Sequence, residues 1–318
     1  MKSPRFIVAF CISLITGSVT CKASSEALQN AESGPDRISG VSLERREVNP
    51  LAEDDPADLY ALAEELDRQN DQNNLARIVD LLKKSASMGH SEAQYSLGVH
   101  YKTGRGVEVN LAAAATWFLK AAEQGNADAQ VAIAVAYFMG GGVPRDPQLG
   151  IPWLRKAARQ GHALAQTTMG TIYAEGELVA KDHAKAIDWF SKAASNGEPD
   201  AQNQLGTYCE AGLGGMPVDY DCAVEWYRKA AIQGSSIGQF NLARLYWSGA
   251  GVPQSWVLAY VWMNIAAANG DEDAPQELST IAKQLDPGEL ERARELSRRW
   301  RIGRDVVDSE PIQPKLAR

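Results

Sequence analysis

The chain has 318 residues and a formal net charge of −8 at pH 7, with 40 acidic and 32 basic residues. Excess acid argues against a protein whose main partner is a phosphate backbone, and 45% hydrophobic content is typical of a soluble protein. We therefore do not expect a nucleic-acid-binding protein.

The first 23 residues have the pattern of a secretory signal peptide. Lys2 and Arg5 precede an apolar run over residues 6–15, small residues follow, and Ala23 is a candidate cleavage position. The run is too short for a comfortable membrane span, and an uncleaved anchor is the alternative. Since this segment holds three basic and no acidic residues, cleavage would change the formal charge from −8 to about −11.

Cys21 raises a further alternative, a lipid-anchored protein. The usual lipoprotein pattern has Ala, Gly or Ser directly before the cysteine, whereas Thr20 stands there in this chain. The pattern is therefore incomplete. Residues 24–55 are rich in Ser, Glu, Asn and Pro and have little periodicity, which predicts a disordered linker.

Residues 56–90 predict a pair of helices at the start of the regular part of the chain. Asp55 can cap a helix that has Pro56 in its first turn, and an apolar stripe follows. Leu81 stands where later units have tryptophan, and Gly89 keeps their register. We expect a degenerate N-terminal repeat or cap here, because a terminal repeat must expose one face to water.

Glycine and tryptophan recur at a near-constant step through residues 91–271. The tryptophans are Trp117, Trp153, Trp189, Trp226 and Trp262. The glycines are spaced 36, 36, 37 and 36 residues apart at Gly125, Gly161, Gly197, Gly234 and Gly270. Self-similarity at this period predicts a stacked array of repeats, in the units 91–126, 127–162, 163–198, 199–235 and 236–271.

Each unit predicts a helix–turn–helix hairpin. In the first unit, Ala93, Leu97 and Tyr101 mark one face of a helix, and Gly104 can end it in a left-handed conformation. A small residue beside that face lets a second helix, which carries tryptophan and an Ala-Ala pair, approach closely. One hairpin cannot bury its apolar face alone, so neighbours must stack into a continuous core. The fold class is therefore all-α, an α/α-hairpin solenoid.

These repeated pieces resemble the Sel-1-like repeat family of secreted bacterial type, a relative of tetratricopeptide repeats. Ala-x-Ala-Gln, Leu-Gly-x-x-Tyr, Gly-x-Gly-Val, Lys-Ala-x-x-Trp and Lys-Ala-Ala-x-x-Gly all occur in the chain. The departures are local: Leu178 replaces a loop glycine, Cys209 replaces a tyrosine, and the fourth unit has one extra loop residue. The resemblance implies a right-handed superhelix and a bacterial, Gram-negative periplasmic protein.

After Gly270 the pattern changes. Two amphipathic segments opened by Asp-x-Pro and Asp-Pro predict capping helices over residues 272–302, and residues 303–318 predict a disordered tail. Arg298, Arg299 and Arg301 lie in the last turns, where positive charge suits the helix dipole. A nucleic-acid site is the alternative for this arginine group, but the domain is not basic and has no evident stacking platform.

Two cysteines follow the candidate cleavage position, Cys209 and Cys222. They lie near the end of one helix and the start of the next, where an antiparallel hairpin brings them together. A disulfide is expected in an oxidising compartment, and two buried apolar thiols are the alternative.

The sequence offers no catalytic residue, metal site or cofactor site. His90 and His162 occupy the turn position after the repeat glycine, and no histidine pair has the i, i+4 spacing of a metal site on a helix. No phosphate loop follows a strand, and no Ser-x-x-Lys acylation motif occurs. We therefore expect no enzymatic activity.

The resemblance implies that the first helices of the hairpins line a concave side. Positions one, five and eight residues after the repeat glutamine form a stripe there, and aromatic and arginine side chains are the usual anchors of a binding surface. The groove candidates are Phe138, Phe240, Arg244, Trp247, Tyr95, Lys102 and Glu210. The alternative, above all for Tyr95 and Phe240, is packing between repeats.

We therefore expect a non-enzymatic scaffold or adaptor of the bacterial envelope that binds a partner protein along this groove. A glycan ligand is a further option, and contact with a membrane would come only through the N-terminal segment. One alternative is a secreted cell-wall enzyme, related to β-lactamases or acting on peptidoglycan. Another is a purely structural spacer.

Overall fold

The computed structural model describes residues 55–306. The expected signal peptide 1–23 with Cys21, the linker up to residue 54, and residues 307–318 of the tail lie outside the described residues. Among the helices between residues 55 and 306, none is both long enough and apolar enough to span a membrane.

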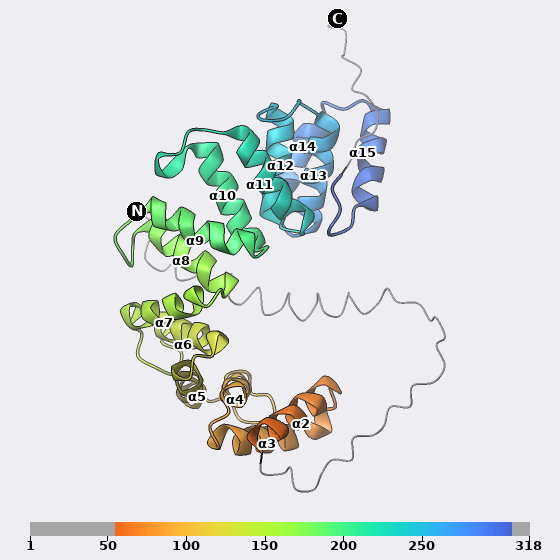
Figure 1. Cartoon of the computed structure of the whole chain (residues 1–318). Helices are drawn as coiled ribbons and strands as arrows, with labels where there is room; N and C mark the ends of the chain where they lie inside the picture. The colour runs from red at the N-terminus through yellow and green to blue at the C-terminus, as the bar shows by residue number, and fades with distance from the viewer. Residues whose placement is uncertain (1–54, 307–318) are drawn as a thin grey trace, which may run out of the picture. The chain divides into compact units, whose positions relative to one another are not determined.

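The described chain is helical throughout, with fourteen α-helices and two short 3₁₀ turns, η1 (Gln72–Asn74) and η2 (Leu213–Gly215). The α-helices are α2 (Pro56–Arg68), α3 (Leu75–Ser87), α4 (Ser91–Thr103), α5 (Leu111–Glu123), α6 (Ala127–Met139), α7 (Pro147–Arg159), α8 (Ala163–Glu175), α9 (His183–Ser195), α10 (Pro199–Ala211), α11 (Tyr220–Ile232), α12 (Ser236–Ser248), α13 (Trp256–Ala268), α14 (Ala274–Ala282) and α15 (Pro287–Arg299). Figure 1 shows them in antiparallel pairs. The expected all-α solenoid of helical hairpins is confirmed.

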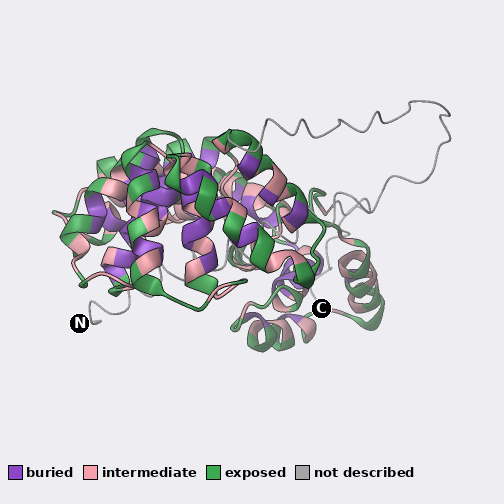
Figure 2. Ribbon diagram, turned by 90° about the horizontal axis from the view of Figure 1, so that it is seen from below, coloured by how far each residue is buried: buried purple, intermediate pink, exposed green. Residues whose placement is uncertain are grey.

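The chain divides into two compact units, the first ending at Ala165 and the second starting at Gln166, both within α8. The first unit holds α2 to α7, and the second holds most of α8 and α9 to α15. Most helices bury part of their surface and expose the rest (Figure 2), whereas α13 is buried on nearly all sides.

Helix ends follow the sequence signals. α4 stops at Gly104, whose φ of +76° is cheap only for glycine, and its backbone N–H donates to the His100 carbonyl. In the loop after α6, a Cβ on Gly142 would lie 2.0 Å from the Leu111 carbonyl oxygen, so only glycine fits. The second helix of each of the five repeats starts at a side-chain cap, as at Asn110, whose Oδ1 accepts from the Ala113 backbone N–H at 2.9 Å.

Within a hairpin, a small residue on the first helix faces a large residue on the second. A Cβ on Gly98 would lie 2.6 Å from Phe118, and a Cβ on Gly170 would lie 2.5 Å from Phe190. The fourth repeat repeats this arrangement with glycine and tyrosine. In the second and fifth repeats the small residue is alanine and its counterpart is not aromatic; the pairs there are Ala134 with Leu154 and Ala243 with Met263. The close helix approach is therefore built by complementary volumes.

In four of the five repeats, a buried glutamine makes a hydrogen bond to the end of the preceding helix. In the second repeat, Gln130 Nε2 donates to the Ala122 carbonyl at 3.2 Å, and Gln130 Oε1 accepts from Gln160 Nε2 at 2.9 Å. Ala122 lies in the last turn of α5, where carbonyls lack intrahelical partners. Equivalent pairs of bonds are made by Gln94 with Ala86 and Gln124, Gln202 with Ala194 and Gln233, and Gln239 with Ala231 and Asn269.

The last two helices cover the fifth repeat. Both α14 and α15 pack against α13. Trp262 is fully buried there and meets the edge of Trp300, with ring centroids 6.3 Å apart. In the earlier repeats the equivalent tryptophan is only partly buried and carries a lysine ammonium over its ring, as Lys156 lies 4.0 Å from the Trp153 centroid. Ile265 takes the place of that lysine where Trp300 covers the surface.

Cys209 and Cys222 form a disulfide, with Cα atoms 5.8 Å apart. The structure therefore contains the bonded alternative. The bond joins the end of α10 to the start of α11, beside the backbone hydrogen bond from the Asp219 N–H to the Cys209 carbonyl at 2.9 Å. Disulfides of this kind are typical of proteins outside the cytoplasm.

The pairing of small and large residues can be tested at Gly170. The substitution Gly170→Ala should lower the free energy of unfolding by about 1–3 kcal/mol, because the added methyl overlaps the buried Phe190 ring. Adding Phe190→Leu copies the natural Ala134 and Leu154 pair and should recover part of the loss. Thermal unfolding followed by circular dichroism measures both. A double variant less stable than Gly170→Ala alone would contradict this pairing of small and large residues.

Candidate functional site

The candidate site lies in the second unit, on the side formed by the first helices of the fourth and fifth repeats. Phe240, Arg244 and Trp247 are spaced four and three residues apart on α12, which puts them on one helix face. Glu210 comes from the last turn of α10. All four side chains line one surface hollow of about 770 Å³, whose remaining walls are Tyr220, Leu245, Ser248, Ala250, Gln254 and Glu277.

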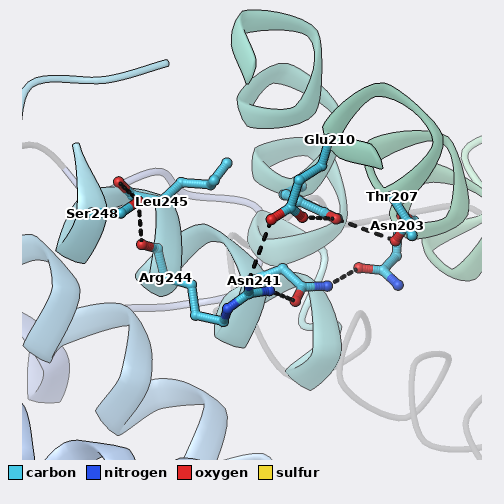
Figure 3. A network of polar contacts seen from close by, with 8 residues as sticks. Asn203, Thr207, Glu210, Asn241, Arg244, Leu245 and Ser248 are labelled. Atoms are coloured by element: carbon cyan, nitrogen blue, oxygen red, sulfur yellow. Dashed lines mark hydrogen bonds and ion pairs between the residues drawn. The ribbon is translucent and has the colours of Figure 1, made fainter. Parts of the chain in front are cut away.

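An ion pair forms the polar wall of this hollow. Arg244 Nη2 lies 3.3 Å from Glu210 Oε1, and the arginine side chain is 47% exposed (Figure 3). The other carboxylate oxygen accepts a hydrogen bond from the Tyr227 hydroxyl at 2.7 Å. Burial raises the pKa of Tyr227 well above its usual range, so this hydroxyl stays protonated as a donor. Glu210 is therefore held from both sides.

A second polar row continues from Arg244 along the same face. Arg244 Nη1 lies 3.4 Å from Asn241 Oδ1, and Asn241 Nδ2 donates to Asn203 Oδ1 at 2.9 Å. Figure 3 shows the two asparagines pointing toward each other across α12 and α10. Asn203 is buried, so this contact ties the two helices together. It fixes the distance between the elements that carry Arg244 and Glu210.

The other wall of the hollow is apolar. Trp247 packs against Trp256, with ring centroids 6.1 Å apart. The Trp247 carbonyl accepts a hydrogen bond from Gln254 Nε2 at 2.8 Å, so the loop after α12 holds the end of this helix. Phe240 is partly buried one turn before Arg244. Aromatic side chains on a rigid helix beside an exposed arginine are typical of a protein-binding surface.

The structure adds residues to the site that the repeat pattern does not predict. Tyr220, Gln254 and Glu277 line the same hollow from α11, from the loop after α12 and from α14. Tyr220 is 42% exposed at the first position of α11. In the sequence, an aromatic residue two positions before Cys222 could have pointed to this part of the site. Glu277 could not be found by counting, because it comes from outside the repeats.

The three remaining groove candidates lie in the first unit. Tyr95 stacks at a tilt against Phe118, with centroids 5.8 Å apart, and burial raises its pKa to about 12. Both rings belong to the first repeat, so this contact packs the two helices of one hairpin together. Lys102 is exposed on α4.

The expectation that Phe138 lies in the groove is wrong. Its side chain is only 3% exposed, so it has no surface to offer a partner. A Cβ on Gly150 would lie 2.9 Å from the Phe138 ring, which therefore fills the space between α6 and α7. The phenylalanine belongs to the core of the second repeat.

The histidines at the repeat turns act as helix caps. His90 Nδ1 accepts a hydrogen bond from the Ala93 backbone N–H at 3.2 Å, and His162 does the same for Ala165 at 3.3 Å. Each imidazole thus takes the place that Asn126 has in the second repeat and Ser235 has in the fifth. Across residues 55–306, no group of three or more His, Cys, Asp or Glu side chains is arranged to hold a metal ion.

The sequence pattern of the Sel1 repeat matches the chain five times, at residues 91–126, 127–162, 163–198, 199–235 and 236–271. The chain belongs to the Sel1 repeat family. The paired helices, the buried glutamines and the glycine helix ends are thus features of Sel1 repeats in this chain. No curated protein matches the sequence significantly.

Two solved Sel1 structures are similar to the chain. The first is c5321 of uropathogenic Escherichia coli, described as a protective antigen with an SLR fold; it is 32% identical with a TM-score of 0.69. That match covers 78% of this chain and 54% of the antigen, so the chain spans about half the length of that protein. The second, a Sel1 repeat protein from Oxalobacter formigenes, is 31% identical with a TM-score of 0.66, covering 75% of this chain and 94% of the other.

The Tyr227–Glu210 bond can be tested by a double-mutant cycle. Tyr227→Phe should lower the free energy of unfolding by about 1.5–3 kcal/mol, because a buried hydrogen bond to a charged group is lost. Glu210→Ala should make most of that loss disappear in the double variant. Denaturant unfolding of the four proteins measures the coupling. Additive effects of the two substitutions would contradict the geometry described here.

Proposed function

We propose that the chain is a non-enzymatic scaffold of the bacterial cell envelope that binds a partner protein at the hollow between α10, α12 and α14. The observation that carries this proposal is the convergence of Glu210, Phe240, Arg244 and Trp247 on that hollow. With Tyr220, three aromatic side chains lie there beside one half-exposed arginine, which is the composition of binding hot spots. Stacked helical repeats commonly serve as extended binding surfaces.

An envelope location, in the Gram-negative periplasm, is part of this proposal. It is supported by the signal-like pattern of residues 1–23 and by the Cys209–Cys222 disulfide. The similar Escherichia coli protein is described as a protective antigen, which agrees with a protein outside the cytoplasm. The excess of acidic residues favours a soluble scaffold over one that binds nucleic acid.

The proposal predicts the behaviour of a double variant at the hollow. Trp247→Ala with Arg244→Glu should abolish capture of the partner, because it removes an aromatic anchor and reverses the charge beside Glu210. Helical circular dichroism should stay unchanged, since Arg244 is half exposed and Trp247 is only partly buried. The measurement is crosslinking in the native host followed by mass spectrometry of the tagged protein.

A matched control carries the same two substitution types away from the hollow, Trp153→Ala with Arg159→Glu on α7. This control should capture the partner as well as the wild-type protein does. Undiminished capture by the Trp247→Ala, Arg244→Glu variant would contradict the placement of the site. Loss of capture by both variants alike would also contradict the placement of the site.

A further inference from the structure

The charges around the hollow are not balanced. Two carboxylates, Glu210 and Glu277, line it together with one guanidinium, that of Arg244. Arg244 is already paired with Glu210 at 3.3 Å. Within residues 55–306 the Glu277 carboxylate forms no ion pair, and it is the second negative charge of the wall. The hollow therefore presents a net negative charge to an incoming group.

Glu210 cannot easily leave Arg244 for another partner. Its side chain is only 21% exposed, and its second oxygen accepts from the buried Tyr227 hydroxyl at 2.7 Å. That hydroxyl is itself positioned by Thr207 Oγ1 at 3.2 Å. An acidic ligand competing for Arg244 would have to displace this carboxylate and would lie near Glu277. Acidic partners are thus disfavoured.

The apolar wall favours the opposite charge. Tyr220, Phe240 and Trp247 come from α11 and α12 and surround the hollow together with Glu277. The faces of aromatic rings attract cations, and tryptophan does so most strongly. A lysine or arginine side chain can also lay its aliphatic stem along such rings while its charged end stays solvated. Aromatic rings beside a carboxylate thus make a surface suited to basic side chains.

We infer that the hollow recognises a basic peptide segment of the partner, in which a lysine or arginine lies next to an apolar residue. The basic end faces Glu277, and the apolar neighbour packs against Trp247 and Phe240. This inference rests on the proposed function, because it names the chemistry of the partner at that same site. Tyr220 and Glu277 are then determinants of specificity, in addition to the residues of the repeat stripe.

The test uses the full chain and a synthetic library of random 12-residue peptides. Peptides retained by the wild-type protein should be enriched in Lys or Arg next to Leu, Ile, Val, Phe or Trp, and depleted in Asp and Glu. For a retained peptide, Glu277→Gln should raise Kd about fivefold, the effect of losing one partly exposed charge pair. Trp247→Ala should raise it further.

Two matched variants keep the test specific. Glu272→Gln removes one charge from an exposed residue outside the hollow and should leave Kd unchanged. Glu277→Lys reverses the charge of the wall and should shift the retained peptides toward acidic sequences. Both proteins should keep the wild-type circular dichroism spectrum.

The outcomes separate this inference from the proposed function. Acidic peptides retained by the wild-type protein and lost in Trp247→Ala would overturn the basic specificity while leaving a peptide-binding scaffold. The basic specificity would also be overturned by an absence of retained peptides when capture in the host still depends on Trp247 and Arg244. If capture in the host does not depend on those residues, the proposed function itself fails.

Discussion

The buried glutamine of each Sel1 repeat is the constraint on which the rest of the structure depends. Its amide lies in an otherwise apolar interface, where an unsatisfied polar group is costly. Gln130 avoids this cost by bonding to Ala122 of the preceding repeat and to Gln160 of its own. The bond to Ala122 forms only if successive hairpins stack in one register, and the bond to Gln160 holds the amide in place within its own hairpin. The amide therefore fixes how one repeat meets the next, while the apolar side chains supply most of the burial.

The candidate site inherits its geometry from this constraint. Gln239 precedes Phe240 on α12 and bonds to Ala231 at the end of α11 and to Asn269 at the end of α13. The register that satisfies Gln239 thus sets the row of Phe240, Arg244 and Trp247 along the same helix. Gly206 then lets Tyr227 lie close against α10, since a Cβ there would be 2.5 Å from the ring. This close approach lets the Tyr227 hydroxyl reach Glu210.

The period of the sequence was sufficient to predict the helices, their glycine ends and the five repeats. Volume patterns were harder to use. Phe138 was expected in the groove because only its distance from Gln130 was counted. Its burial has a sequence signal: Gly150 stands where the other repeats have alanine at Ala114, Ala186, Ala223 and Ala259. The missing methyl makes room for the phenylalanine ring. In contrast, Glu210 and Trp247 occupy the same stripe position in repeats that keep the alanine, and both line the hollow.

Residues outside the repeats could not be placed by periodicity. Glu277 reaches the hollow from α14, a helix of 9 residues where the regular repeat helices have 13. No spacing rule connects it to α12. Its position depends on how α14 packs against α13, which is set by buried apolar residues such as Ile281. The charge of the site is thus decided by an element that the repeat pattern does not describe.

The most direct test of the central constraint is hydrogen exchange of a Gln239→Met variant. Methionine keeps the length of the side chain but removes both of its hydrogen bonds to the neighbouring helices. Our account predicts faster exchange of backbone amides in α11 and α12, where the fourth and fifth repeats meet, and unchanged protection in α4 to α6. Wild-type protection in α11 and α12 of the variant would contradict it.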